Sequence, residues 1–140
     1  MKSTALWFLP VLLLSGCSIV QTVTPVKEAG FDEVCIIENP AVRSGFLEAY
    51  RHALEENGYK TRVLPKDASV NDCDVTTIYV ANWRWDVALY MQYAHIKVFR
   101  QGHVAGEAVY DSTRAGARVD KFIKAEAKVQ ELTSELFPKK

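Results

Sequence analysis

Cys17 is the residue whose position most clearly indicates chemistry, because it directly follows an apolar run near the start of the chain. Lys2 gives that start a basic charge, and Ala5–Leu14 is almost wholly apolar. A short basic segment followed by such a run is typical of a secretory signal peptide. The run is too short to cross a bilayer as a helix, which takes about 20 apolar residues. The sequence therefore predicts export.

The four residues Leu14-Ser15-Gly16-Cys17 resemble the lipobox of bacterial lipoproteins. This resemblance implies that signal peptidase II cuts before Cys17 and that Cys17 carries the lipid, with palmitate among its acyl groups. Ser18 is not the aspartate associated with inner-membrane retention. The resemblance thus implies a lipoprotein of the outer membrane, facing the periplasm. An ordinary signal peptide, or a signal anchor with a chance cysteine, remains the alternative.

Three segments follow from this interpretation. Residues 1–16 form the signal peptide, residues 17–30 form the lipidated cysteine and a flexible tether, and residues 31–140 form one folded domain. The tether is expected because the stretch is polar and β-branched and contains Pro25. The remaining length suits a single domain with a core of its own.

The charge balance excludes some partners. The chain has 17 basic and 17 acidic residues, so no basic excess favours nucleic acid. No polybasic patch flanks Cys17, so attachment to a membrane would depend on the lipid itself.

Cys35 and Cys73 form an even pair once Cys17 is acylated. Exported proteins meet an oxidising compartment, which favours a disulfide between the two. Such a bridge would stabilise the fold by about 3–4 kcal/mol in the chain-entropy model. Two separate buried thiols are the alternative. The absence of a Cys-x-x-Cys motif argues against a zinc knuckle and against thioredoxin-like redox chemistry.

Catalytic and cofactor motifs are absent from the sequence. His52, His95 and His103 have no metal-binding spacing, so no metal site is expected. There is no Gly-x-Ser-x-Gly elbow and no phosphate-binding glycine loop, so no cofactor is expected either. We therefore expect that the protein is not an enzyme. The alternative is a small envelope enzyme, acting on cell-wall or lipid material through Asp86, His95 or Asp111.

The pattern of apolar residues predicts five strands and two helices. The strands are expected at 34–37, 59–64, 74–85, 88–99 and 104–110, and the helices from Asn39-Pro40 to Asn57-Gly58 and from Asp120 to Pro138. This order predicts an α+β fold, in which a βαβ unit and a three-strand antiparallel meander form one mixed sheet with both helices on one face. The arrangement is similar to small α/β domains of Gram-negative envelope-assembly lipoproteins.

An aromatic row marks the long strand over 74–85. Tyr79, Trp83 and Trp85 share one face there, because alternate residues of a strand point the same way. Together with Tyr93 they are candidates for a partner-binding surface, or else they build the core; Arg84 and Asp86 would form a rim ion pair in the second case. The predicted function is a non-catalytic protein-binding or envelope-assembly module, with a homo-oligomeric structural lipoprotein as a further alternative.

Overall fold

The computed structural model describes residues 16–27 and 30–140, so the predicted signal peptide lies outside the described residues except for Gly16. The elements in chain order are β1 (Val20–Thr24), β2 (Glu33–Ile37), α1 (Ser44–Glu56), β3 (Lys60–Leu64), β4 (Val75–Asp86), β5 (Ala88–Arg100), β6 (His103–Asp111), the 3-10 helix η1 (Val119–Phe122) and α2 (Ala125–Leu136). Within these described ranges, neither helix has the length and apolar character needed to cross a membrane.

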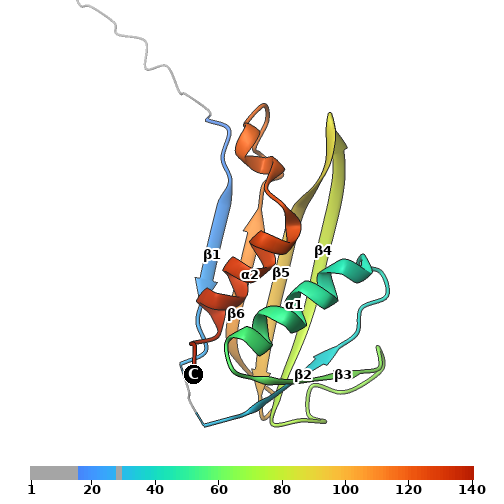
Figure 1. Cartoon of the computed structure of the whole chain (residues 1–140), viewed down its shortest axis with the longest axis vertical. Helices are drawn as coiled ribbons and strands as arrows, with labels where there is room; N and C mark the ends of the chain where they lie inside the picture. The colour runs from blue at the N-terminus through green and yellow to red at the C-terminus, as the bar shows by residue number, and fades with distance from the viewer. Residues whose placement is uncertain (1–15, 28–29) are drawn as a thin grey trace, which may run out of the picture.

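All six strands form one mixed sheet in the order β1-β6-β5-β4-β2-β3. Strand β2 runs parallel to both β3 and β4, and the other neighbours are antiparallel. The two α-helices lie against the same face of the sheet (Figure 1). The predicted α+β fold, with its βαβ unit, meander and two helices on one face, is confirmed.

Strand β1 corrects the expectation of a flexible tether at 17–30. Val20–Thr24 pairs with the outer edge of β6, with Val20 opposite Asp111 and Thr24 opposite Glu107. Beyond the strand, the Val26 amide donates to the Leu136 carbonyl at the end of α2. Side chains reinforce the contact, since Lys128 of α2 donates to Gln21 at 2.9 Å. The chain is thus part of the fold almost from Cys17 onward.

Helix α1 buries Phe46, Tyr50, Ala53 and Leu54 against the sheet. It begins at Ser44, four residues after the predicted Pro40, because Asn39 is used in a turn of its own. The Asn39 side chain accepts from the Ala41 amide and donates to the Tyr79 carbonyl of β4. At the other end, the helix stops at Asn57-Gly58 as predicted, and Gly58 takes the left-handed conformation common after helices, with a φ of 95°.

The C-terminal helix is shorter than predicted. Asp120 does not cap it, because Val119–Phe122 form the separate 3-10 helix η1. Ile123 and Lys124 then take extended backbone angles before α2 begins at Ala125. The apolar spacing in this region thus continues across a break in the helix. Val129, Leu132 and Leu136 of α2 complete the core above β5 and β6.

Candidate functional site

The β4–β5 hairpin extends past both α-helices at one end of the sheet (Figure 1). Its two strands remain paired as far as Asp86 and Ala88, and Val87 makes the turn with a φ of 62°. The side chains there are apolar and open to solvent: Trp85 is 72% exposed and Val87 is 88% exposed. Large apolar residues gathered at an exposed end mark an interaction surface rather than a core.

Helix η1 packs beside this hairpin and is held there by Lys121. The Lys121 side chain is only 4% exposed, and its Nζ lies 2.6 Å from Asp86 Oδ2. The same Nζ lies over the rings of Tyr90 and Phe122, at 5.4 and 5.1 Å from their centroids. The predicted ion pair between Arg84 and Asp86 is therefore not formed, because the Asp86 carboxylate pairs with Lys121 instead.

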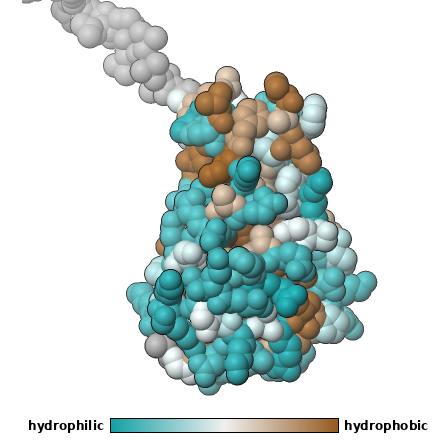
Figure 2. Space-filling view, in the orientation of Figure 1, coloured by the Kyte–Doolittle hydropathy of each residue, from teal (hydrophilic) through white to brown (hydrophobic). Residues whose placement is uncertain are grey.

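Helix η1 brings further apolar side chains to the same end of the molecule. Val119 and Ile123 are exposed there, as is Leu89 on the hairpin. We call these five residues the apolar tip: Trp85, Val87, Leu89, Val119 and Ile123. Figure 2 shows hydrophobic surface at this end, on a face that is otherwise largely hydrophilic.

Cys17 lies at the same end of the fold as the apolar tip. The Ser18 amide donates to the Arg114 carbonyl at 3.0 Å, in the loop that leads to η1. The Cys17 sulfur lies so close to Gly116 that a Cβ there would be 2.5 Å from it. Cys17 itself is exposed and is not in a disulfide. The candidate lipidation site is thus positioned directly by the loop beside η1.

A cavity of about 440 Å³ lies behind the tip, between the hairpin and the first turns of the two α-helices. Its apolar wall includes Phe46, Trp83, Met91 and Val129. Leu89 and Ile123 of the apolar tip line it as well. The volume is in the range of small-molecule sites, which are apolar with a few polar groups placed to orient the ligand.

The charged residues that line the cavity are Arg43, Lys124 and Glu126. The Arg43 guanidinium lies 5.8 Å from the centroid of the Trp83 ring. Neither Arg43 nor Lys124 forms an ion pair with any residue of 16–27 or 30–140. Glu126 supplies one carboxylate, so the set carries a net positive charge.

The first turns of α1 and α2 also border this cavity, and no side chain caps either of them. The first amides of a helix have no partner within the helix and favour negative charge. The cavity therefore combines an apolar wall with groups that suit an anion.

The four aromatic candidates for partner binding do not form one surface. Tyr79 is 4% exposed and stacks on Phe46 with centroids 5.0 Å apart, so its assignment to an exposed surface is wrong. Trp83 is half-buried against the core and lines the cavity. Trp85 is exposed in the apolar tip. Tyr93 is half-buried and pairs with Asn82 and Asp111, on the opposite face of the sheet.

Trp83 and Trp85 do share a facing, as alternation along the strand predicts. Their partners on β5 are Met91 and Leu89. The pairing shifts between Asn82 and Trp83, so that β5 carries an extra residue, Gln92, at this point. Trp83 differs from Trp85 in burial because its ring packs edge-on against Phe46 of α1, with centroids 6.4 Å apart, whereas Trp85 is 72% exposed.

The face of the sheet without helices carries its own mixed surface. Ile78 and Val80 of β4 are exposed there, and Val80 is 45% exposed. His95 Nε2 lies 2.5 Å from Glu107 Oε1 on the same face, and Lys97 Nζ lies 3.8 Å from that oxygen. Protein–protein interfaces bury an apolar centre inside a polar rim, and this face offers residues of both kinds.

The residues considered for catalysis are not brought together. Asp86 pairs with Lys121, and His95 pairs with Glu107. The hydroxyl and amide of Thr113 both donate to Asp111 and hold the pKa of that carboxyl below its usual value. None of the three candidates lines the 440 Å³ cavity.

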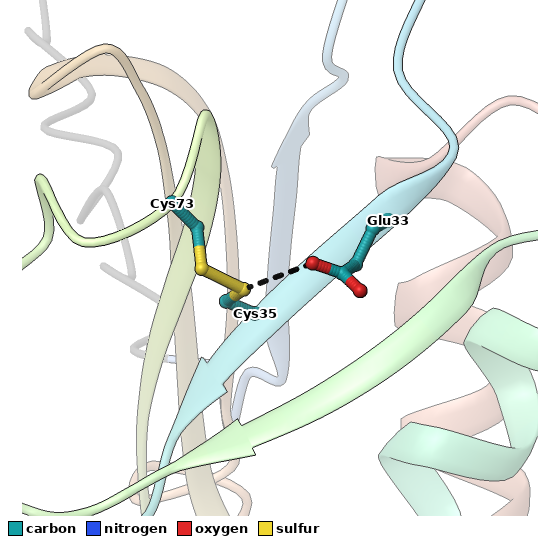
Figure 3. A group of neighbouring side chains, drawn as sticks. All are labelled: Glu33, Cys35 and Cys73. Carbon is teal, nitrogen blue, oxygen red and sulfur yellow. Dashed lines mark hydrogen bonds between the residues drawn. A yellow bond between two sulfur atoms is a disulfide. The ribbon is translucent and has the colours of Figure 1, made fainter.

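The cysteine pair is joined as predicted. Cys35 and Cys73 form a disulfide with Cα atoms 6.3 Å apart. Glu33 Oε1 lies 3.7 Å from the Cys35 sulfur, and Figure 3 shows the three side chains together. Three such residues within reach of one another resemble a metal site. Sulfur atoms in a disulfide cannot act as thiolate ligands, so this group is structural.

Comparison with known proteins finds a likeness of fold. No protein-family model matches the chain, and no curated protein matches it. Solved structures do match, among them two from Paraburkholderia phytofirmans. One is a PelC variant dodecamer, with a TM-score of 0.59 at 11% identity, covering 84% of this chain and 96% of that chain. The other is a PelC dodecamer, with a TM-score of 0.58 at 14% identity, covering 85% and 98%. At these identities the likeness concerns the fold.

Proposed function

We propose that this protein is an outer-membrane lipoprotein that faces the periplasm and acts as a non-catalytic, homo-oligomeric binding or assembly module. The observation that carries the proposal is the position of Cys17 beside the apolar tip. A lipid on Cys17 would enter the membrane next to Trp85 and Val87, with no tether between lipid and fold. Tryptophan favours membrane interfaces, where its ring is buried and its N–H stays hydrated.

This arrangement gives the domain a defined orientation. The acyl groups on Cys17 would insert into the membrane, and apolar side chains beside them would bury further area at its surface. The apolar tip would supply these side chains. The uncovered face of the sheet would then stand away from the lipid surface and remain free for protein contacts.

The homo-oligomer is supported by the two PelC structures, which are both described as dodecamers. In this chain the surface best suited to a second copy is the uncovered sheet face around Ile78 and Val80. The apolar tip is less suited, because it lies beside the candidate lipidation site.

Lipidation is tested by expressing the full chain in a bacterium with labelled palmitate. Wild-type chain should be labelled and fractionate with the outer membrane, and Cys17→Ala should be neither labelled nor processed. Ser18→Asp is the matched control, expected to keep the label but move to the inner membrane. A mature, labelled Cys17→Ala protein would refute the lipidation proposal.

Oligomerisation is tested by native mass spectrometry of the detergent-solubilised protein. Val80→Arg places a charge on the uncovered sheet face and should shift the protein to monomer. Val63→Arg is the control, because Val63 is an exposed valine of β3 paired with buried Ile36 and faces the side of the helices. A wild-type monomer, or an oligomer unaffected by Val80→Arg, would contradict this assignment.

A further inference from the structure

We propose that the cavity behind the apolar tip binds an anionic phospholipid, with the phosphate at Arg43 and Lys124 and part of an acyl chain against the apolar wall. This inference rests on the proposed membrane-facing orientation for the source of its ligand. It goes beyond the lipid on Cys17, because the ligand here is a separate, non-covalently bound molecule.

The wall of the cavity sets the first requirement on the ligand. Trp83, Leu89 and Ile123 present carbon surface, which favours a hydrocarbon segment over a fully polar solute, and the buried Phe46, Met91 and Val129 pack behind them. Inorganic phosphate alone would leave that surface wet and should bind weakly.

The rim of the cavity sets the second requirement. Arg43 and Lys124 have no ion-pair partner within the described ranges, whereas the buried Lys121 nearby is fully engaged with Asp86. Arginine forms paired hydrogen bonds with phosphate oxygens, and lysine adds a point charge. Glu126 offsets one of these two charges, which leaves room for one anionic group rather than several.

The position of the cavity connects it to the membrane. Leu89 and Ile123 belong both to the cavity wall and to the apolar tip, so one apolar surface continues from the tip into the cavity. A phospholipid in the leaflet beneath the tip would therefore contact Leu89 and Ile123 before its phosphate reached the charged rim. A soluble anion has no hydrocarbon segment that could contact this continuous apolar surface.

The test uses the chain without residues 1–16 and with Cys17→Ser, together with short-chain phospholipids that dissolve as monomers. Dihexanoyl phosphatidylglycerol should bind, as measured by calorimetry and by a change in tryptophan fluorescence. Dihexanoyl phosphatidylcholine, which carries no net charge, and inorganic phosphate should bind at least tenfold more weakly. Because this protein lacks the acylated cysteine, the result does not depend on lipidation.

The double variant Arg43→Gln/Lys124→Gln should lose about tenfold or more in affinity for the phosphatidylglycerol, since a hydrogen bond to a charged group contributes roughly that much. Lys66→Gln/Lys139→Gln is the matched control, with the same charge change at exposed sites away from the cavity, and should bind as wild type. Equal binding of both phospholipids, equal binding of phosphate, or an unaffected double variant would each overturn the proposal. If phosphatidylglycerol binds while Cys17 proves not to be acylated, the cavity assignment stands and the anchoring proposal fails.

Discussion

Reduction of the Cys35–Cys73 disulfide should lower the free energy of unfolding by about 4 kcal/mol at 25 °C. The two cysteines are 38 residues apart, and the loop they close gives this value in the chain-entropy model. The bridge also lies where β2 and β4 pair through only two residues of each strand. The paired residues between β2 and β4 are Cys35 with Thr76 and Ile36 with Thr77, so the disulfide joins the βαβ unit to the meander at its shortest junction.

Urea denaturation of the chain without residues 1–16, carrying Cys17→Ser, measures this directly. In a thermal melt, the same loss of free energy should lower the melting temperature of a domain of this size by roughly 12–20 °C. The double variant Cys35→Ala/Cys73→Ala is the control, and its stability should be low and insensitive to reductant. If the oxidised and reduced proteins unfold at the same urea concentration, the bridge does not restrain the unfolded chain as argued.

Three further predictions concern polar side chains that join different elements of the fold. Tyr50→Phe should cost only about 1 kcal/mol in urea denaturation, because Thr77 keeps its second hydrogen bond, to the Lys97 carbonyl; a loss of several kcal/mol would contradict this. Lys128 donates to Glu131 and lowers the pKa of the Glu131 carboxyl. The stability that this contact adds to the folded state is complete above the ordinary pKa of 4.5 and is lost as the pH falls through the lowered pKa. Between about pH 6 and about pH 3, the melting temperature should therefore fall less steeply in Glu131→Gln than in wild type. Parallel curves would show that the Glu131 contact does not contribute to the pH dependence of stability. Lys121→Met should speed hydrogen exchange in η1 about tenfold or more while α2 stays protected, and unchanged exchange in η1 would show that the lysine does not hold it.

Local signals in the sequence predicted much of the fold. The spacing of Phe46, Tyr50 and Leu54 indicated α1. Gly58 indicated its end, because glycine takes the positive φ found there without steric cost. The disulfide followed from counting cysteines in an exported chain. Each of these depends on residues close in sequence or on compartment chemistry.

Strand β1 was missed because its cause is distant in the sequence. The residues from Val20 to Thr24 have the β-branched composition of a strand but little apolar character, and their partner strand begins at His103. These residues form a strand because they pair with the edge of β6 and contact side chains of α2. The break between η1 and α2 has a similar origin, since the contact of Lys121 with Asp86 joins segments that are 35 residues apart.

The candidate site shows the same division. The sequence by itself determined that Cys17 is a candidate for lipidation and that Trp83 and Trp85 face the same way, because motif and strand alternation are local properties. It did not determine that Trp85 is exposed while Trp83 is half-buried, since this depends on where the packed helices end along the hairpin. Nor did it determine that Arg43 and Lys124, which directly precede two different helices, line one cavity behind the tip. Burial and proximity of this kind arise from packing between distant segments, so only the tertiary structure decided them.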